Sequence, residues 1–154
     1  MALHIAEVTG PDAAADALLA AHEASMRALS PAESCHVLSA EQLRAAGARV
    51  FLGRDETGGG VAIGAVAPLG PGAAELKSMH CAATARGRGH GRALLRHLMQ
   101  IAREGGLLTL WLETGSSEAF APARRLYRSE GFVECPSFGS YRPDPASVFM
   151  TRGL

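Results

Sequence analysis

The sequence predicts an α/β protein in which helices flank a mixed β-sheet, and three observations support this class. Apolar residues at helical spacing alternate along the chain with short apolar runs that are typical of strands. Glycine or proline separates most of these segments. The chain has 154 residues, 47% of them apolar, which is enough for one buried core. Because neither a repeat nor a linker is visible, we expect a single domain over residues 1–154.

The first half of the chain is expected to hold two helices and four strands. Residues 3–8 have a strand pattern that ends at a Gly-Pro turn. Apolar residues from Ala15 to Leu29 recur at helical spacing. Ser39, followed by Gln42 three residues later, fits a capping box at the start of a short helix. The other expected strands are residues 49–53, 61–67 and 74–81, and a glycine-rich turn joins the first two as a hairpin.

The second half is expected to hold two helices and three strands. Leu94, Leu95 and Leu98 belong to one apolar stripe, which makes the helix over residues 89–103 the clearest element. Residues 107–113 form a near-continuous apolar run, as in a buried strand. The remaining elements are a helix over residues 121–130 and strands over residues 132–135 and 147–151. This order is typical of a mixed sheet flanked by helices.

Charge and composition exclude several classes of protein. The 15 basic and 15 acidic residues cancel, so no overall field attracts nucleic acid or an anionic membrane, and neither is an expected partner. Acidic residues near the start, where a secretory signal would be basic, and the lack of a membrane-length apolar run predict a cytoplasmic protein. Cys35, Cys81 and Cys135 lie far apart without metal-ligand spacing, so we expect no metal.

The most informative segment is the loop Arg86-Gly87-Arg88-Gly89-His90-Gly91, which follows a strand and opens a helix. Glycines let the backbone turn tightly and bring its amides close to an anion, and the helix adds unpaired N–H groups and the positive end of its dipole. The span from 86 to 103 holds several arginines and no acidic residue, which concentrates positive potential there. The pattern predicts a phosphate-binding loop.

Other interpretations of this loop fit the residues less well. A P-loop needs Gly-Lys-Ser/Thr, whereas the only lysine, Lys77, precedes the loop. A dinucleotide fingerprint needs GxGxxG, and Glu113, which ends the next strand, lies at the wrong spacing for its acidic residue. An RNA-binding Arg-Gly-Gly tract would be disordered and would not lead into an amphipathic helix. A solvated arginine face after an ordinary turn is the simplest structural alternative.

The loop resembles the R/Q-x-x-G-x-G/A signature of the GNAT acetyltransferases in Arg86, Gly89 and Gly91. Residues 75–81 resemble the strand that precedes this signature, and Ala123-x-x-Leu126-Tyr127-x-x-x-Gly131-Phe132 resembles the second helix motif of the family. Segments 113–116, 120–124 and 141–150 are similar to those of a bacterial subgroup whose substrate is unsettled. The resemblance implies a mostly antiparallel sheet of about seven strands flanked by about four helices.

The resemblance also implies that acetyl-CoA is the co-substrate and that residues around the loop bind it. The expected cofactor-binding residues are Met79, His80, Cys81, Arg86, Gly87, Arg88, Gly89, His90, Gly91, Arg92, Ser116, Phe120 and Ala123. Backbone amides of Met79 and Cys81 would bind the pantetheine arm and polarise the thioester carbonyl. Phe120 stands where many members have asparagine, so that polar contact is expected to be missing or supplied by Ser116 or Ser117.

Acetyl transfer to an amine needs a general base, because an alkylammonium group with a pKa of about 10 has no lone pair at neutral pH. Glu75 and Glu113 are equally ranked candidates beside the loop, and in histone-acetylating relatives a glutamate resembling Glu75 is the base. Either carboxylate could instead form a structural ion pair with Lys77 or an arginine. Tyr127 resembles the tyrosine that protonates the departing thiolate, and its helical position also fits a core residue.

The candidate residues favour an N-acetyltransferase in which a primary amine of a small molecule or peptide attacks acetyl-CoA directly in a ternary complex. His36, Tyr141 and Asp144 are candidate substrate contacts, because they lie in irregular segments near the expected site. One alternative is a non-catalytic sensor that binds coenzyme A. Another is a nucleic-acid binder, which predicts strongly salt-dependent binding to any polyanion. Proteins of this resemblance often form homodimers, so a dimer is possible.

Overall fold

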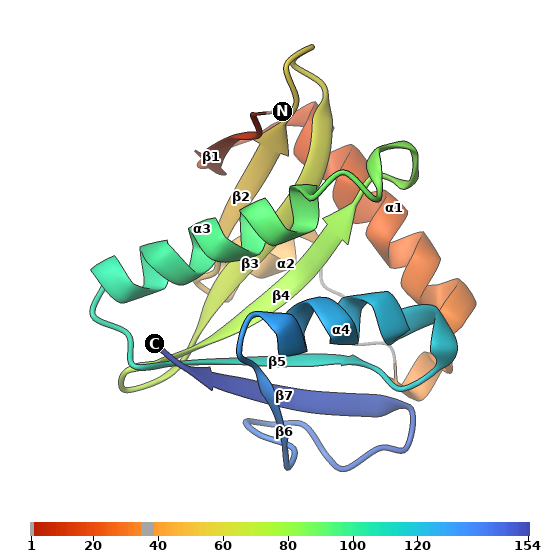
Figure 1. Ribbon diagram of the computed structural model, residues 1–154, viewed down its shortest axis with the longest axis vertical. Coiled ribbons are helices and arrows are strands. Elements are labelled where there is room, and N and C mark those ends of the chain that lie inside the picture. The colour runs from red at the N-terminus through yellow and green to blue at the C-terminus, as the bar shows by residue number, and fades with distance from the viewer. Residues whose placement is uncertain (1, 35–38) are drawn as a thin grey trace.

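A seven-stranded β-sheet with helices on both faces forms the centre of the protein (Figure 1). The computed structural model describes residues 2–34 and 39–154. The strands lie in the order β1-β2-β3-β4-β5-β7-β6. Their bounds are β1 His4–Val8, β2 Arg49–Arg54, β3 Gly60–Gly70, β4 Ala73–Cys81, β5 Thr109–Gly115, β6 Val133–Cys135 and β7 Ser147–Gly153. The predicted class, a mixed sheet flanked by helices, is confirmed.

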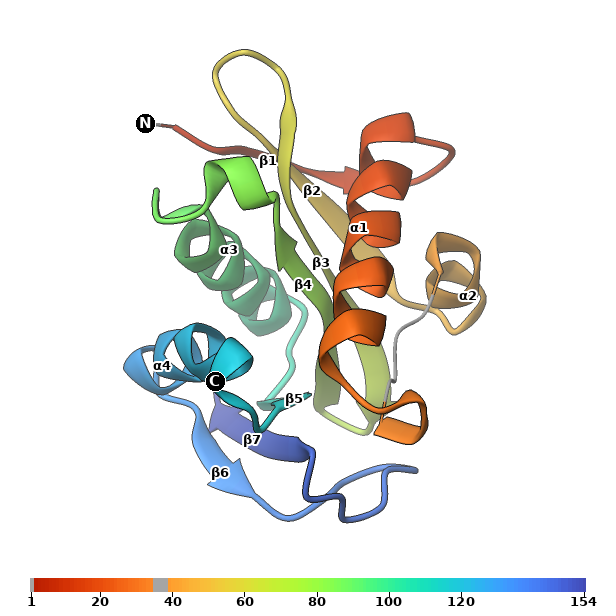
Figure 2. The same cartoon turned by 90° about the vertical axis from the view of Figure 1, so that its right-hand side faces the viewer.

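The helices divide between the two faces of the sheet. Their bounds are α1 Ala13–Leu29, α2 Ala40–Ala45, α3 His90–Glu104 and α4 Ala121–Ser129, with short 3₁₀ turns at Ala32–Ser34, Ala83–Ala85 and Glu118–Phe120. Figure 2 shows α1 and α2 on one side of the sheet and α3 and α4 on the other. No helix among the described residues is long and apolar enough to cross a membrane.

Side-chain caps begin the first two helices. The Asp12 carboxylate accepts hydrogen bonds from the amides of Ala14 and Ala15, which would otherwise lack a partner in α1. Ser39 and Gln42 form the reciprocal capping box that the sequence predicted for α2. These caps fix where each helix starts, and therefore which of its faces meets the sheet.

Each face of the sheet has its own apolar core. Leu94, Leu95 and Leu98 of α3 are almost wholly buried against one face, together with Leu76 of β4 and Phe132. The other core packs α1 and α2 against the opposite face, and its members are Ala15, Leu18, Leu19, Leu43, Ala48, Val50, Leu52, Ile63, Ala65 and Ala67. The helical stripes in the sequence correctly identified most of the residues that face the sheet, but Leu29, the last residue of the first stripe, is 45% exposed.

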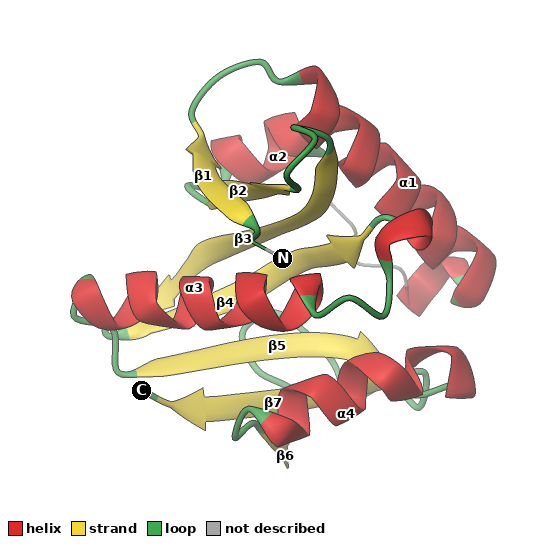
Figure 3. Cartoon of the chain, turned by 45° about the horizontal axis from the view of Figure 1, so that its top comes forward, coloured by secondary structure: helices red, strands yellow, loops and turns green. Residues whose placement is uncertain are grey.

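The parallel pairing of β4 with β5 is the feature of the sheet that positions the site. All other neighbouring strands are antiparallel, whereas β4 and β5 run parallel and pair only from Ala73↔Thr109 to Leu76↔Leu112. Beyond these pairs the two strands diverge, as Figure 3 shows. The carboxyl half of β4 therefore still pairs with β3, and that of β5 with β7, but the two halves do not pair with each other.

One predicted strand begins later in the structure than the sequence suggested. The apolar run at 107–113 was expected to be buried throughout, but β5 begins at Thr109 and the side chain of Leu108 is 71% exposed. The amides of Leu108 and Thr109 both donate to the carbonyl of Gly72, so Leu108 lies in the turn that leads into the strand. An apolar run does not distinguish these two cases, because its residues look alike in a strand and in the turn before it.

Candidate active site

A bulge in β4 turns side chains into the opening between the diverging strands. Ser78 has φ of 57°, in the left-handed region that a non-glycine residue seldom adopts, and the register with β3 shifts at this point. As a result Leu76 and Met79, three positions apart, both pack toward α3. Gly64 on β3 makes room for this, because a Cβ there would lie 2.5 Å from the Met79 sulfur.

A cleft of about 560 Å³ runs through this opening. Residues from α1, β4, the loop before α3, β5 and α4 line it, together with Tyr141 from the loop before β7. It brings together most of the residues predicted from sequence, namely Glu75, Met79, His80, Cys81, Arg86, Gly87, Gly89, His90, Gly91, Arg92, Glu113, Phe120, Ala123, Tyr127 and Tyr141. The sequence motifs therefore converge on one cavity although they span residues 75 to 141.

The loop at the start of α3 has the form of an open anion cradle. Gly87 and Gly89 have φ of 79° and 82°, and a Cβ at either position would meet no atom within 4 Å. Gly89 is the N-cap residue of α3, no side chain caps that end, and the first turn contains no acidic residue. The first amides of α3 thus keep their donor capacity for an anion, which the helix dipole also favours. The diphosphate of coenzyme A fits this donor set.

Arginines beside the cradle are held by the surrounding structure. The Arg86 Nε donates to the carbonyl of Cys81 at 3.3 Å, which ties the loop to the end of β4. Arg92 donates to the Ser129 hydroxyl at 2.9 Å and lies 3.4 Å from the Glu130 carboxylate, which also pairs with Arg96. These contacts connect the start of α3 with the end of α4 and keep positive charge at the mouth of the cleft.

Glu75 lies at the centre of a buried polar group in the cleft. Its side chain is only 8% exposed, and its carboxylate accepts a hydrogen bond of 2.5 Å from the Tyr141 hydroxyl. The Lys77 ammonium lies 3.3 Å from the same carboxylate and donates to the Tyr141 oxygen at 3.1 Å. Phe138 and Phe149 pack edge-on or tilted against the Tyr141 ring and hold it in place. The predicted ion pair of Glu75 with Lys77 is therefore present.

Glu113 has the different environment that a proton acceptor needs at neutral pH. It lies on β5 just past the last residue that pairs with β4, and its side chain is partly buried. The pKa of its carboxyl is raised from 4.5 to about 7, mainly by burial and with smaller contributions from the neighbouring charges of Glu75 and Asp144. The Ser147 hydroxyl and Lys77 oppose this rise without cancelling it.

Tyr127 lies deep in the cleft on α4. It is 7% exposed, packs edge-on against Phe132, and so has the core packing that its helical position predicted as well as access to the cleft. Burial, followed by the nearby Cys81 and Glu113, raises the pKa of its phenol well above the usual range. The hydroxyl consequently keeps its proton at every physiological pH. Burial also raises the pKa of the Cys81 thiol, which makes it a poor nucleophile.

The sequence over residues 46–134 matches the family model described as the acetyltransferase (GNAT) domain. The chain belongs to the GNAT acetyltransferase family. This GNAT chain is 38% identical over 156 residues to the uncharacterized N-acetyltransferase YsnE of Bacillus subtilis (strain 168), an alignment that covers the full length of both. It is 42% identical over 127 residues to the IAA acetyltransferase of Azospirillum brasilense, covering 82% of this chain and 81% of that one.

A solved structure has the same fold over almost the whole GNAT chain. A protein of Klebsiella pneumoniae subsp. pneumoniae MGH 78578 superposes with a TM-score of 0.80 at 29% identity, covering 99% of this chain and 97% of the other. The family and its named N-acetyltransferase members make this protein an N-acetyltransferase enzyme, and GNAT enzymes use acetyl-CoA as the acetyl donor.

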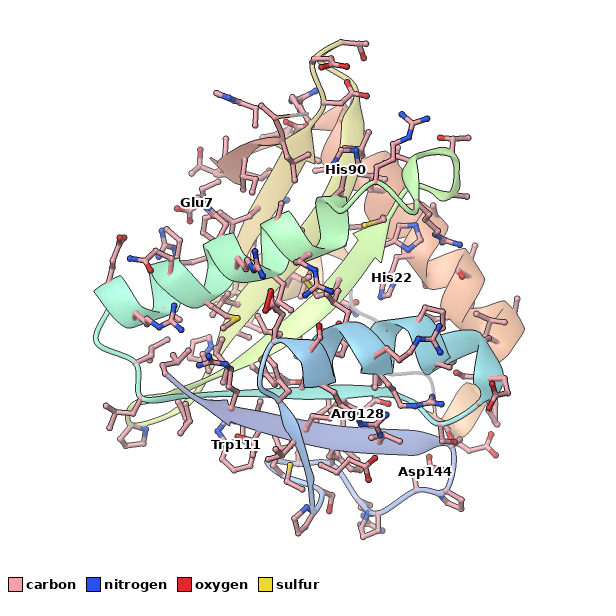
Figure 4. The ribbon with its side chains drawn as sticks, in the orientation of Figure 1. Glu7, His22, His90, Trp111, Arg128 and Asp144 are labelled. Atoms are coloured by element: carbon pink, nitrogen blue, oxygen red, sulfur yellow. The ribbon has the colours of Figure 1, made fainter. Side chains whose placement is uncertain are left out.

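Some predicted site residues of the GNAT enzyme lie outside the cleft. Arg88 is exposed at the tip of the loop and is not among the lining residues. Ser116 is exposed, and its hydroxyl donates to the carbonyl of Pro145 at 2.6 Å. Asp144 accepts hydrogen bonds from the Ser34 hydroxyl and the Ala146 amide, and in Figure 4 it lies in the loop below β7, away from His90. His36 falls outside the described residues.

Two histidines of the cleft wall were not combined by the sequence analysis. His22 of α1, labelled in Figure 4, lines the cleft. Its ring centroid lies 5.2 Å from that of His80 at the end of β4. Burial, followed by the charge of His80, lowers the pKa of His22 to about 4, so its imidazole is neutral at physiological pH. The residues are 58 positions apart in the sequence, and only the packing of α1 against β4 brings them together.

The end of β5 is held by contacts of Phe120 and Arg124 that the sequence analysis did not predict. The Phe120 ring covers Gly115 so closely that a Cβ there would lie 2.0 Å from the ring. Arg124 donates to the carbonyls of Gly115 and Ser117 at 2.7 and 2.9 Å. These contacts hold the strand end that carries Glu113. The sequence could have shown this only through the fixed spacing of the phenylalanine, arginine and glycine.

Proposed function

We propose that this enzyme transfers the acetyl group of acetyl-CoA to a primary amine of a small molecule or peptide by direct attack in a ternary complex. The observation that carries the proposal is Glu113, a carboxyl group with a pKa raised to about 7 in the cleft that also contains the cradle. A base of this strength accepts a proton near neutral pH without being permanently protonated.

The donor would be held by backbone groups of the loop and by the first turn of α3. The open amides at Gly87, Gly89 and the helix start support a role in binding the diphosphate. Past the bulge, the edge of β4 that faces β5 has no strand partner, so the backbone at Met79 and Cys81 is available to the pantetheine arm. Phe120 lines the same cavity and would contribute apolar contact at the position where many family members have an asparagine.

Glu113 is the better candidate for the base of the two glutamates. Glu75 already accepts a hydrogen bond from Tyr141 and pairs with Lys77, so its carboxylate has two partners in the resting protein. To remove a proton from the acceptor, Glu75 would have to give up its contacts with Tyr141 and Lys77. Glu113 has the raised pKa and sits where β4 and β5 separate, beside the expected position of the thioester. Glu75 is accordingly proposed to position Lys77 and Tyr141.

Tyr127 is proposed to donate to the sulfur that leaves. Its raised pKa keeps the phenol protonated, and Tyr127 lines the same cleft as Cys81 at the end of β4. Hydrogen bonding to the developing thiolate requires only a fixed donor close to the sulfur, which a buried tyrosine on a short helix provides.

The proposal is tested by following thiol release from acetyl-CoA with a panel of amines, peptides and IAA, the last because a relative is named for it. We expect at least one acceptor to raise thiol release well above hydrolysis, and Glu113→Gln to remove most of that increase. Tight binding of acetyl-CoA with no acceptor-dependent release would contradict the proposal and favour a coenzyme A sensor.

A further inference from the structure

The only lysine of the chain lies inside the cleft. Lys77 is on β4 directly before the bulge, and its side chain is 19% exposed. It points away from the core that contains Leu76 and toward Tyr141, whose ring centroid is 5.6 Å from the ammonium nitrogen. A lysine on a protein surface is normally solvated, so this position inside the cavity needs an explanation.

The surroundings of the Lys77 nitrogen are those proposed for the acceptor amine. Glu75 lies 3.3 Å and the Tyr141 hydroxyl 3.1 Å from the nitrogen. Glu113 lines the same cleft as Lys77, whose charge lowers the pKa of the Glu113 carboxyl. Lys77 is itself a primary alkylamine, the chemical class of the proposed acceptor. A reactive amine held in the cavity reaches a bound thioester at a high effective concentration, provided that its nitrogen can approach the carbonyl carbon.

We propose that Lys77 is a site of self-acetylation by bound acetyl-CoA. The inference rests on the proposed function, because the donor must occupy the cleft. After the ammonium group loses a proton to Glu113, the neutral nitrogen attacks the thioester carbonyl carbon. A carbon–nitrogen bond forms and the carbon–sulfur bond breaks. The second amine proton is released, and coenzyme A leaves as the thiol. The products are acetyl-Lys77, coenzyme A and one proton for each lysyl ammonium consumed.

Acetylation of Lys77 would change the acceptor side of the cleft. It removes the positive charge that pairs with Glu75 and adds an uncharged group to the cavity. The Glu75 carboxylate then keeps Tyr141 but loses its cation, inside a site where an unpaired charge is costly. The modified enzyme should therefore turn over free acceptors more slowly, and an excess of acetyl-CoA without acceptor should inactivate it gradually.

The test incubates the folded protein with acetyl-CoA and no acceptor, then measures intact mass and maps the peptides. We expect one acetyl group per chain on Lys77, gained at least about 10-fold faster than by the urea-unfolded chain under the same conditions. Lys77→Arg, which keeps the positive charge, should lose this acetyl group, and Glu113→Gln should gain it more slowly. Equal rates in folded and unfolded protein, or an acetyl group that persists in Lys77→Arg, would overturn the inference.

The amine panel separates this result from the proposed function. If free amines are acetylated while Lys77 stays unmodified in the folded protein, the self-acetylation is wrong and the proposed function stands. If Lys77 is acetylated and no amine of the panel is, the inference holds and the choice of acceptor class is wrong. Peptide mapping distinguishes Lys77 from the N-terminal amine in each case.

Discussion

Replacement of Glu113 by glutamine should stabilise the protein and inactivate it. The raised pKa means that the folded state holds the carboxyl proton more tightly than the unfolded chain does. Between pH 4.5 and about 7 the folded state binds more protons, so the free energy of unfolding falls as the pH rises through this window. Below it both states are protonated, and above it both are ionised.

The magnitude follows from the same two values. The pKa rises from 4.5 to about 7, and each unit corresponds to about 1.4 kcal/mol, so ionised Glu113 costs up to about 3 kcal/mol of stability. Glutamine has no charge to bury. We therefore expect the free energy of unfolding of Glu113→Gln to match the wild type near pH 4.5 and to exceed it by about 2 to 3 kcal/mol near pH 8.

Urea unfolding at several pH values measures this difference directly. Glu118→Gln, at an exposed glutamate in the 3₁₀ turn that follows β5, is the matched control and should show no such pH-dependent gain. The activity assay tests the predicted inactivation. Wild-type turnover should rise with pH and level off above about 7, and the turnover of Glu113→Gln should be lower by about 100-fold or more. A stability difference that stays constant across pH would refute the assigned pKa and its role.

Three further variants test other parts of the site and fold. Gly89→Glu should abolish coenzyme A binding in a calorimetric titration, because it places a negative charge in the cradle; Gly89→Ala, which shares the backbone strain at φ of 82°, should retain more affinity, and equal loss in both would count against the cradle. Tyr127→Phe should lower kcat with coenzyme A affinity nearly intact, and unchanged kcat would remove the hydroxyl from the mechanism. Leu98→Ala, at a fully buried position on the face of α3 that packs against the sheet, should lower the free energy of unfolding by about 2 to 5 kcal/mol in urea, whereas a loss below about 1 kcal/mol would contradict that packing.

Most of the fold could be predicted because its signals are local. The stripe that contains Leu94 and Leu98 depends only on helical spacing, and the capping box of Ser39 and Gln42 only on neighbouring residues. The predicted start of β5 was wrong, because the identity of an apolar residue such as Leu108 does not show whether its side chain is buried. Strand pairing is set by contacts far apart in the sequence, and the divergence of β4 from β5 leaves no local pattern.

The sequence predicted which residues form the site, but not how the charged groups of the site interact. The glycine loop and the two glutamates could be found, because motif spacing identifies them. The difference in environment between Glu75 and Glu113 could not be predicted, because it depends on which side chains contact each carboxylate. Tyr141 comes from a loop 66 residues after Glu75, and only the aromatic packing of that loop aims its hydroxyl at the carboxylate. The burial that raises the pKa of Glu113 likewise comes from distant segments.

The separation of β4 from β5 leaves two strand edges inside the molecule. An unpaired edge on the outside of a protein invites pairing with the edges of other chains, which leads to aggregation. Here the two edges border the cleft inside the protein, with α3 and α4 on one side of the sheet and α1 on the other (Figure 2). The protein can therefore keep unpaired backbone groups available to a ligand without exposing a strand edge that would promote aggregation.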